Sequence, residues 1–277
     1  MRKFAIGTAV CGALALSALA VPTASAATPD LSFSGVVVNG GKAIVVGTTA
    51  TVKIPVTYTL TRPADLVIDY KNNAAGIMLY RGSLATPENT IENDAAPVCT
   101  ATATTATTVT ESCKETIALD PYDYLFEAAD ATTWKAAGFY GHIAEDSDDS
   151  DGHVSFEYGY DAWGGLGTAQ IKRAAKLTTN ATPEPVKKGA TLTVKGALTR
   201  ANWETSKYSG YTGQSVTLQF RAKSSSTYKN VKTVKSGTSG ALSTTVKASA
   251  DGYYRYTFAG TTTTGAKSAA GDYVDVK

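Results

Sequence analysis

Residues 51–60 read TVKIPVTYTL, and their apolar and polar side chains alternate along the whole segment. The apolar set consists of Val52, Ile54, Val56, Tyr58 and Leu60. Alternation with a period of two is typical of a β-strand that buries one face. Pro55 falls on the polar set and favours an edge strand or a bulge, because proline donates no ladder hydrogen bond. The segment therefore predicts β-structure packed on one side.

Short apolar runs recur through the rest of the chain, and almost none keeps a helical period. Before residue 180 we expect strands at 66–70, 116–119, 138–143, 154–158 and 169–172. After residue 190 the alternation is more regular, and Ser- and Gly-rich turns separate the runs. Closely spaced short strands of this kind are typical of an immunoglobulin-like sandwich. We predict an all-β protein with two immunoglobulin-like β-sandwich domains in tandem.

The start of the chain has the parts of an export signal. A basic beginning, an apolar stretch and a small-residue exit predict a signal peptide over residues 1–27. No later run approaches the roughly 20 apolar residues of a membrane span. We therefore expect a secreted, extracellular protein. The polar, proline-marked segment 181–189 predicts a linker between an acidic domain, 28–180, and a basic domain, 190–277.

Two cysteines, Cys99 and Cys113, lie beyond the predicted signal peptide. In an exported chain two cysteines most simply form one disulfide. The alternative is a metal-binding or catalytic thiol pair, but no histidine is near in sequence and the spacing matches no zinc pattern. We predict a Cys99–Cys113 disulfide that closes a Thr- and Ala-rich segment.

Formal charge is divided unequally along the chain. Residues 28–180 carry 19 Asp and Glu against 10 Lys and Arg, a formal charge of −9. Residues 181–277 carry 5 against 14, a formal charge of +9. Such asymmetry bears on partners and association rather than on fold. Either the two halves attract each other or the basic half binds an external polyanion.

An acidic loop, residues 145–152 (EDSDDSDG), lies between two expected strands. Crowded carboxylates repel one another, and Ca²⁺ relieves that repulsion because it accepts six to eight oxygen ligands in flexible geometry. The predicted calcium ligands are Asp146, Asp148, Asp149, Asp151 and Glu157, with Asp130 and Asp161 as further candidates. An EF-hand does not fit, since Gly152 falls one place late when Asp146 takes the first position. The alternative is a solvated loop, which is the usual state of a charge run.

Three segments of the basic half carry a family resemblance: LTRANW at 198–203, VTLQFR at 216–221 and GYYRY at 252–256. They resemble a module of secreted tandem Ig-like proteins from filamentous actinobacteria. The resemblance covers residues 134–277 and is strongest after Arg173. It implies the sandwich fold. Some members are described as calcium-binding, and in this chain that property would apply only to the acidic loop.

The basic half also suggests adhesion to a cell-wall polyanion or glycan. The residues expected to face such a polymer are Arg200, Lys207, Arg221, Lys223, Lys229, Lys232, Lys235 and Lys247. Nearby aromatic side chains, Trp203, Tyr208 and Tyr211, are expected to stack on sugar rings. The alternative is a soluble domain with lysines scattered around its rim. Nucleic acid is not an expected partner of an exported chain without a recognition helix.

Sequence motifs of common enzyme classes are missing. The chain has no G-x-S-x-G, H-E-x-x-H, P-loop or dinucleotide fingerprint. A carboxylate pair for glycoside cleavage depends on a separation in space, which sequence does not supply. Small tandem sandwiches bind more often than they catalyse, which is an argument by analogy. We expect a binding or structural protein and no enzyme.

The acidic loop leads to a first test. If Ca²⁺ binds with a Kd of roughly 10⁻⁴ to 10⁻³ M, as in extracellular modules, tenfold excess over Kd stabilises the fold by about 1.4 kcal/mol. Thermal unfolding with and without millimolar Ca²⁺ measures this, and the double variant Asp148→Asn/Asp151→Asn should abolish the effect. If the melting temperature of the wild type does not change with Ca²⁺, the solvated-loop interpretation is supported instead.

Overall fold

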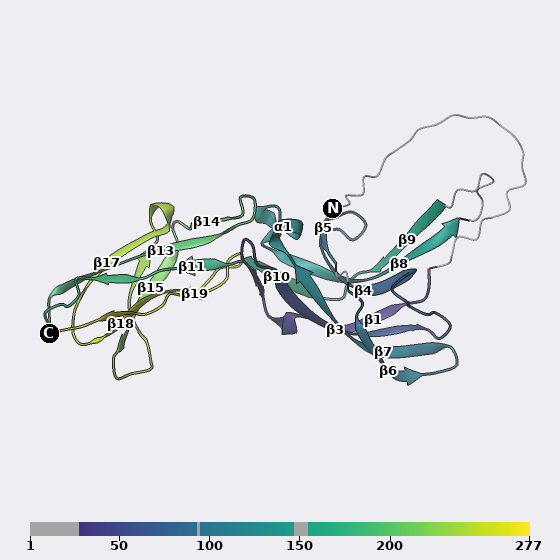
Figure 1. Cartoon of the computed structure of the whole chain (residues 1–277), viewed down its shortest axis with the longest axis horizontal. Helices are drawn as coiled ribbons and strands as arrows, with labels where there is room; N and C mark the ends of the chain where they lie inside the picture. Colours follow the sequence, from purple (N-terminus) through teal and green to yellow (C-terminus); the bar gives the residue numbers. More distant parts are fainter. Residues whose placement is uncertain (1–27, 93–94, 147–154) are drawn as a thin grey trace, which may run out of the picture.

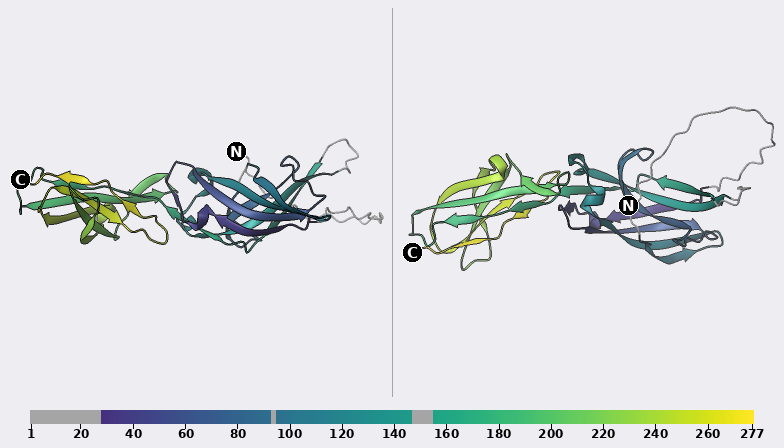
Figure 2. Two further views of the ribbon diagram at one scale, coloured as in Figure 1. Left: turned by 90° about the horizontal axis from the view of Figure 1, so that it is seen from below. Right: turned by 45° about the horizontal axis from the view of Figure 1, so that its top comes forward.

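Figure 1 shows the computed structural model of the chain, whose described residues are 28–92, 95–146 and 155–277. Four sheets form two Ig-like β-sandwiches that lie end to end, and Figure 2 shows the same elongated arrangement from two further sides. Within these described ranges, no helix has the length and apolarity needed to cross a membrane. The predicted signal peptide, residues 1–27, lies outside the described residues.

The N-terminal sandwich packs a four-stranded sheet on a six-stranded one. The first has the order β1–β3–β7–β6, with β1 (Ser32–Val38), β3 (Val52–Pro63), β6 (Val98–Thr104) and β7 (Thr108–Leu119). The second has the order β2–β10–β8–β4–β5 with β9 on β8, and consists of β2 (Ile44–Val46), β4 (Asn73–Gly82), β5 (Pro87–Ile91), β8 (Thr133–Asp146), β9 (Ser155–Trp163) and β10 (Thr168–Arg173). Short helical turns are η1 (Asn39–Gly41), α1 (Pro121–Tyr124) and η2 (Ala128–Asp130).

The C-terminal sandwich also has two sheets. One is centred on β13 (Thr191–Asn202), which pairs with β11 (Ala175–Leu177), β12 (Asn180–Thr182), β14 (Lys207–Gly210) and β17 (Ala241–Lys247). The other has the order β16–β15–β18–β19 with β20 on β18, and consists of β15 (Ser215–Ala222), β16 (Lys229–Lys235), β18 (Gly252–Phe258), β19 (Lys267–Ser268) and β20 (Asp272–Val274). The short turn η3 (Thr238–Gly240) precedes β17.

The alternating segment 51–60 forms most of β3, and its inward side chains are buried as the pattern predicts. Ile54, Val56, Tyr58 and Leu60 are at most 3% exposed. The expectation that Pro55 marks an edge strand is wrong for the strand as a whole, because β3 lies between β1 and β7. The last residue pair with β1 is Val38 with Val56, so Pro55 lies just beyond the paired part.

The strand expected at residues 66–70 is a loop. Side chains, rather than a neighbouring strand, form hydrogen bonds with the backbone of this loop. Arg62 Nη1 donates to the carbonyl of Leu66 at 2.6 Å, and Asn73 Nδ2 donates to that of Val67 at 2.9 Å. The carboxylate of Asp69 accepts from the next backbone N–H groups, which is a turn that aspartate favours.

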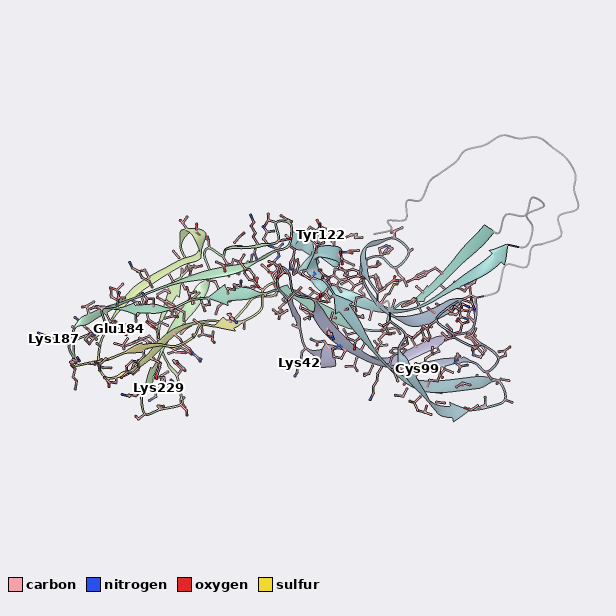
Figure 3. The ribbon with its side chains drawn as sticks, viewed as in Figure 1. Lys42, Cys99, Tyr122, Glu184, Lys187 and Lys229 are labelled. Carbon is pink, nitrogen blue, oxygen red and sulfur yellow. A yellow bond between two sulfur atoms is a disulfide. The ribbon has the colours of Figure 1, made fainter. Side chains whose placement is uncertain are left out.

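The predicted Cys99–Cys113 disulfide is confirmed. The two cysteines lie directly opposite each other in the β6–β7 hairpin, and Figure 3 labels Cys99 on that hairpin. The Thr- and Ala-rich segment between them forms the end of the hairpin. On the chain-entropy model, closing a loop of about 15 residues stabilises the fold by roughly 3 kcal/mol.

The segment 181–189, expected to be a linker, packs along the C-terminal sandwich in the structure. Ala181 and Val186 are buried in the C-terminal core, and Val186 bridges to Val276. The chain crosses between the sandwiches earlier, at Arg173 and Ala174. There β10 of one sandwich is followed directly by β11 of the next.

Trp203 joins the two sandwiches. It follows β13 of the C-terminal sandwich, but its side chain belongs to the N-terminal core and is 5% exposed. Its indole Nε1 donates to the carbonyl of Gly47 at 2.9 Å. The guanidinium carbon of Arg173 lies 5.2 Å from the indole ring. A large aromatic anchor from one domain is therefore buried in the other.

Main-chain hydrogen bonds hold the same joint. Ala174 N donates to Val46 O at 2.8 Å, and Ala201 N donates to Ala174 O at 2.8 Å. Arg173 is paired with the segment before β19, since its N–H donates to Thr263 O at 3.0 Å. The ion pairs found among the described residues each stay within one sandwich. Among the described residues, the joint is thus held by a buried aromatic side chain and by hydrogen bonds, and no ion pair crosses it.

From this joint we predict that the two sandwiches unfold in one transition. The substitution Trp203→Ala should split this transition into two. Truncating a buried tryptophan costs about 3–5 kcal/mol. Calorimetry should show an N-terminal transition that moves to lower temperature and away from the C-terminal one. Tyr122→Ala is the matched control, because Tyr122 on α1 is 77% exposed (Figure 3). Unchanged, coincident melting of Trp203→Ala would contradict the prediction.

Candidate functional site

The predicted calcium ligands fall only partly within the described structure. Asp148, Asp149 and Asp151 lie outside the described residues. Asp146 ends β8 and Glu157 lies in β9, where it pairs with Ala144. Among the residues that the structure describes, no group of three or more His, Cys, Asp or Glu side chains could hold a metal ion. Calcium binding by the acidic loop therefore stays a prediction.

The two further candidates have other partners. Asp130 precedes β8 and Asp146 ends it, and a strand of 14 residues at about 3.3 Å each puts roughly 40 Å between them. Asp130 is fully buried, lies 3.1 Å from Arg81 Nε and accepts the backbone N–H of Phe126 at 2.8 Å. Asp161 accepts from the hydroxyl of Thr28 at 3.0 Å. Asp130 thus stabilises the fold near the start of β8, at the opposite end of that strand from Asp146.

The outer side of the sheet β15–β18–β20 carries an arginine–tyrosine face. We define this face by Arg221, Tyr228, Tyr253, Arg255 and Tyr273. Successive side chains of a strand point to opposite sides of a sheet. Because the residues that alternate with Tyr253 and Arg255 in β18 are buried in the core, these two side chains lie on the outer side. The register pairs Arg221 with Tyr253 across β15 and β18.

Both arginines of the face lie over tyrosine rings. The guanidinium carbon of Arg221 is 4.1 Å from the ring centre of Tyr253 and 5.3 Å from that of Tyr228. The guanidinium carbon of Arg255 is 3.7 Å from the ring centre of Tyr228. Tyr253 and Tyr273 lie 5.2 Å apart with their rings tilted by 55°. Each such cation–π contact contributes about 0.5–2 kcal/mol, depending on desolvation.

Hydrogen bonds to neutral acceptors orient the two guanidinium groups. Arg255 Nε donates to Gln219 Oε1 at 2.9 Å, and Gln219 Nε2 donates to Asn230 Oδ1 at 2.9 Å. Arg221 Nη1 donates to the carbonyl of Ser225 at 2.6 Å. Within the described part of the chain, neither arginine is in an ion pair with a carboxylate. Since a guanidinium has five N–H donors, each arginine keeps donors for a ligand.

The basic residues expected to form a binding surface are spread over both sheets. Arg221 and Lys223 are on or beside the arginine–tyrosine face, since Lys223 Nζ lies 5.5 Å from the ring of Tyr273. On the edge strand β16 of the same sheet are Lys229, labelled in Figure 3, Lys232 and Lys235. The opposite sheet carries Arg200, Lys207 and Lys247. One sheet therefore holds most of the predicted cations.

The aromatic residues expected to stack on sugars make contacts within the protein, and sugar binding by them stays a prediction. Trp203 is buried in the joint. Lys176 Nζ lies 3.8 Å from the ring centre of Tyr208, and the guanidinium of Arg200 lies 4.2 Å from that of Tyr211. Sequence reasoning missed Tyr228, Tyr253, Arg255 and Tyr273 as surface residues. The alternation in GYYRY was the available signal, because it places residues 253 and 255 on one side of the strand.

A second candidate site is an inter-sheet pocket of about 260 Å³ in the N-terminal sandwich. Its lining residues are Tyr70, Ala74, Ala75, Gly76, Ala95, Ala96, Pro97, Glu115 and Phe139. Glu115 takes an inward position on β7 between Cys113 and Ile117, and it is 7% exposed. The carboxylate accepts from Ile77 N at 3.1 Å and from the hydroxyl of Tyr58 at 3.4 Å.

Burial raises the pKa of Glu115 to about 7, although the hydrogen bonds from Ile77 and Tyr58 act in the opposite direction. Burial and the negative charge of Glu115 also raise the pKa of Tyr58 and of Tyr70. Tyr58 donates to Glu115, and Tyr70 and Lys114 each line a pocket together with it. The charged or titratable groups beside Tyr70 are Arg62 of β3, Glu111 of β7 and His142 of β8. Arg62 is engaged by Glu111, with Nε to Oε2 at 3.0 Å.

The raised pKa predicts a pH-dependent stability. The folded state favours the neutral carboxyl, so this contribution is complete below the unfolded pKa of about 4.5 and is lost as pH rises through about 7. Between pH 5 and pH 8, Glu115→Gln should gain roughly 2 kcal/mol of unfolding free energy relative to the wild type, measured in urea. Glu88→Gln is the control, because the Glu88 side chain is 59% exposed. A constant difference between Glu115→Gln and wild type would contradict the burial argument.

Comparison with known proteins finds distant similarities among solved structures. No protein-family model and no curated protein matches it. The full ectodomain (Ig1–Ig3) of mouse nectin-like molecule 4 is 14% identical with a TM-score of 0.23, over 90% of this chain and 64% of that one. Domains A168–A170 of titin are 8% identical with a TM-score of 0.23, over 90% of this chain and 67% of that one. This chain thus spans less than two thirds of the nectin-like ectodomain, and its resemblance to actinobacterial secreted proteins stays a prediction.

Proposed function

We propose that this protein is an exported, non-catalytic binding protein that attaches to an anionic cell-surface polymer through its arginine–tyrosine face. The observation that supports this is the placement of Arg221 and Arg255 over tyrosine rings on an outward sheet surface. Both arginines are oriented by neutral partners, and in the described residues no carboxylate neutralises them.

The chemistry of the face favours phosphate or carboxylate groups. An arginine binds such anions through two parallel N–H···O bonds, and its planar group is held in place by stacking. The tyrosine rings add flat apolar surface on which the sugar units of a glycan can lie. An extended polymer with repeated anions fits a sheet surface that presents two guanidinium groups on its outer side.

The charge division agrees with an external partner. The half with a formal charge of +9 attracts anions over about a Debye length, which is about 8 Å at physiological salt. Mutual neutralisation of the two halves is the alternative. The joint argues against it, because hydrogen bonds and the indole of Trp203 make the contacts there.

Calcium binding by the acidic loop is a separate proposal with a separate test. It belongs to the N-terminal sandwich, whereas the arginine–tyrosine face belongs to the C-terminal one. Neither activity requires the other, so the loss of one in a variant should leave the other intact.

Binding to two purified polymers tests the proposed function: poly(glycerol phosphate) and polygalacturonate. Wild-type affinity should fall steeply from 10 to 150 mM salt. The double variant Arg221→Gln/Arg255→Gln should bind at least about tenfold more weakly, equivalent to about 1.4 kcal/mol.

The matched control is Lys187→Gln/Lys188→Gln, which removes the same charge at the end of the C-terminal sandwich far from the joint, where Figure 3 labels Lys187. This control should change affinity less than about twofold, because exposed charges contribute little individually. Equal losses in both double variants would show that net charge alone, and not the face, determines binding.

A further inference from the structure

The inter-sheet pocket brings together residues from both sheets of the N-terminal sandwich. Glu115 comes from β7 of one sheet, and Phe139 comes from β8 of the other. Tyr70, in the loop between β3 and β4, has a left-handed backbone with φ of 56° and donates from its hydroxyl to Ala75 O at 3.1 Å. The hydrogen bond to Ala75 holds the Tyr70 side chain in the pocket wall.

Small residues on β4 keep the pocket open. Ala74, Ala75 and Gly76 line the pocket, and none of them has a side chain larger than a methyl group. A Cβ atom at Gly76 would come within 3.0 Å of Glu115 Oε2 and 3.1 Å of a ring carbon of Phe139. The bare backbone at this position therefore leaves the carboxylate and the aromatic ring accessible from the cavity.

The carboxylate of Glu115 has unused acceptor capacity. An ionised carboxylate offers about four lone-pair positions, and the structure fills two of them with Ile77 N–H and the Tyr58 hydroxyl. In the described residues no cation is within ion-pair distance of it, since Arg62 is engaged by Glu111. A buried carboxylate without a counter-ion is costly, and a cationic ligand would remove that cost.

We propose that the inter-sheet pocket binds a primary alkylammonium group, with Glu115 as its counter-ion and with Tyr70 and Phe139 against its alkyl chain. An ammonium supplies three donors to one acceptor centre, and the aromatic faces favour a nearby cation. The cavity of about 260 Å³ is below the roughly 300–1,000 Å³ of pockets for drug-sized ligands, so the occupant is small. This inference is independent of polymer binding by the other sandwich.

Calorimetric titration of the full mature chain at pH 8 tests the pocket with four probes: n-butylamine, n-butanol, butyrate and Nα-acetyllysine methylamide. Butylamine should bind at least about tenfold more tightly than butanol or butyrate. The lysine derivative identifies the source of the ammonium: binding like butylamine assigns it to lysine side chains, and weaker binding assigns it to free amines. Equal binding of butanol or butyrate would overturn the proposal.

Glu115→Gln, which keeps the shape of the side chain, should weaken butylamine binding at least about tenfold, while Glu88→Gln should leave it unchanged. Ala74→Leu fills the pocket from β4 without altering the carboxylate and should also abolish binding. Circular dichroism verifies the fold of each variant. Undiminished butylamine affinity in folded Glu115→Gln or Ala74→Leu would overturn the proposed site.

Discussion

The burial of Trp203 in the neighbouring core is the contact on which the arrangement of the molecule depends. The chain enters the C-terminal sandwich at Ala174, directly after β10, so there is no free connector between the two bodies. The indole and the main-chain bonds around it occupy the ends of the sandwiches. Because the contact is end to end, as Figures 1 and 2 show, the outer sheet surfaces of both domains remain exposed. The arginine–tyrosine face, which lies on such a surface, therefore remains accessible.

The arginine–tyrosine face, the proposed binding surface, lies on the outer side of a sheet. A sheet buries one side, and its other side is free to vary because the fold does not depend on it. On β15 and β18 that side carries cations beneath aromatic rings. The stacking partly desolvates the guanidinium groups and restricts their rotamers, so less entropy is lost when a ligand binds. Exposed lysines such as those of β16 have no such restraint.

Glu115 and Glu111 show how position within one strand separates two carboxylates of the same type. Glu111 is near the surface end of β7 and is paired with Arg62 through two N–H···O contacts. Glu115, four residues further, points between the sheets, where burial raises its pKa. The cost of that burial is tolerated because two hydrogen bonds and a cavity, rather than packed hydrocarbon, surround the carboxylate. A group of this kind in a cleft is a candidate for ligand binding.

The sequence by itself determined the local features of this protein. Alternation in residues 51–60 predicted which side chains of β3 are buried, and the two cysteines of a chain expected to be exported predicted their disulfide. Alternation in GYYRY also indicates that Tyr253 and Arg255 lie on the same side of β18, although this was not among the predictions. The buried and outward positions of these strand side chains follow from a period of two, which a single strand expresses.

Only the tertiary structure decided which residues meet across sheets and domains. It placed Trp203 in the neighbouring core, turned residues 66–70 into a loop, and put Ala74, Ala75 and Gly76 opposite Glu115. Such contacts join residues far apart in sequence, and strand order and sandwich packing determine them. A periodic pattern specifies the two sides of a strand but not what lies opposite each side, and for that reason the candidate sites required the fold.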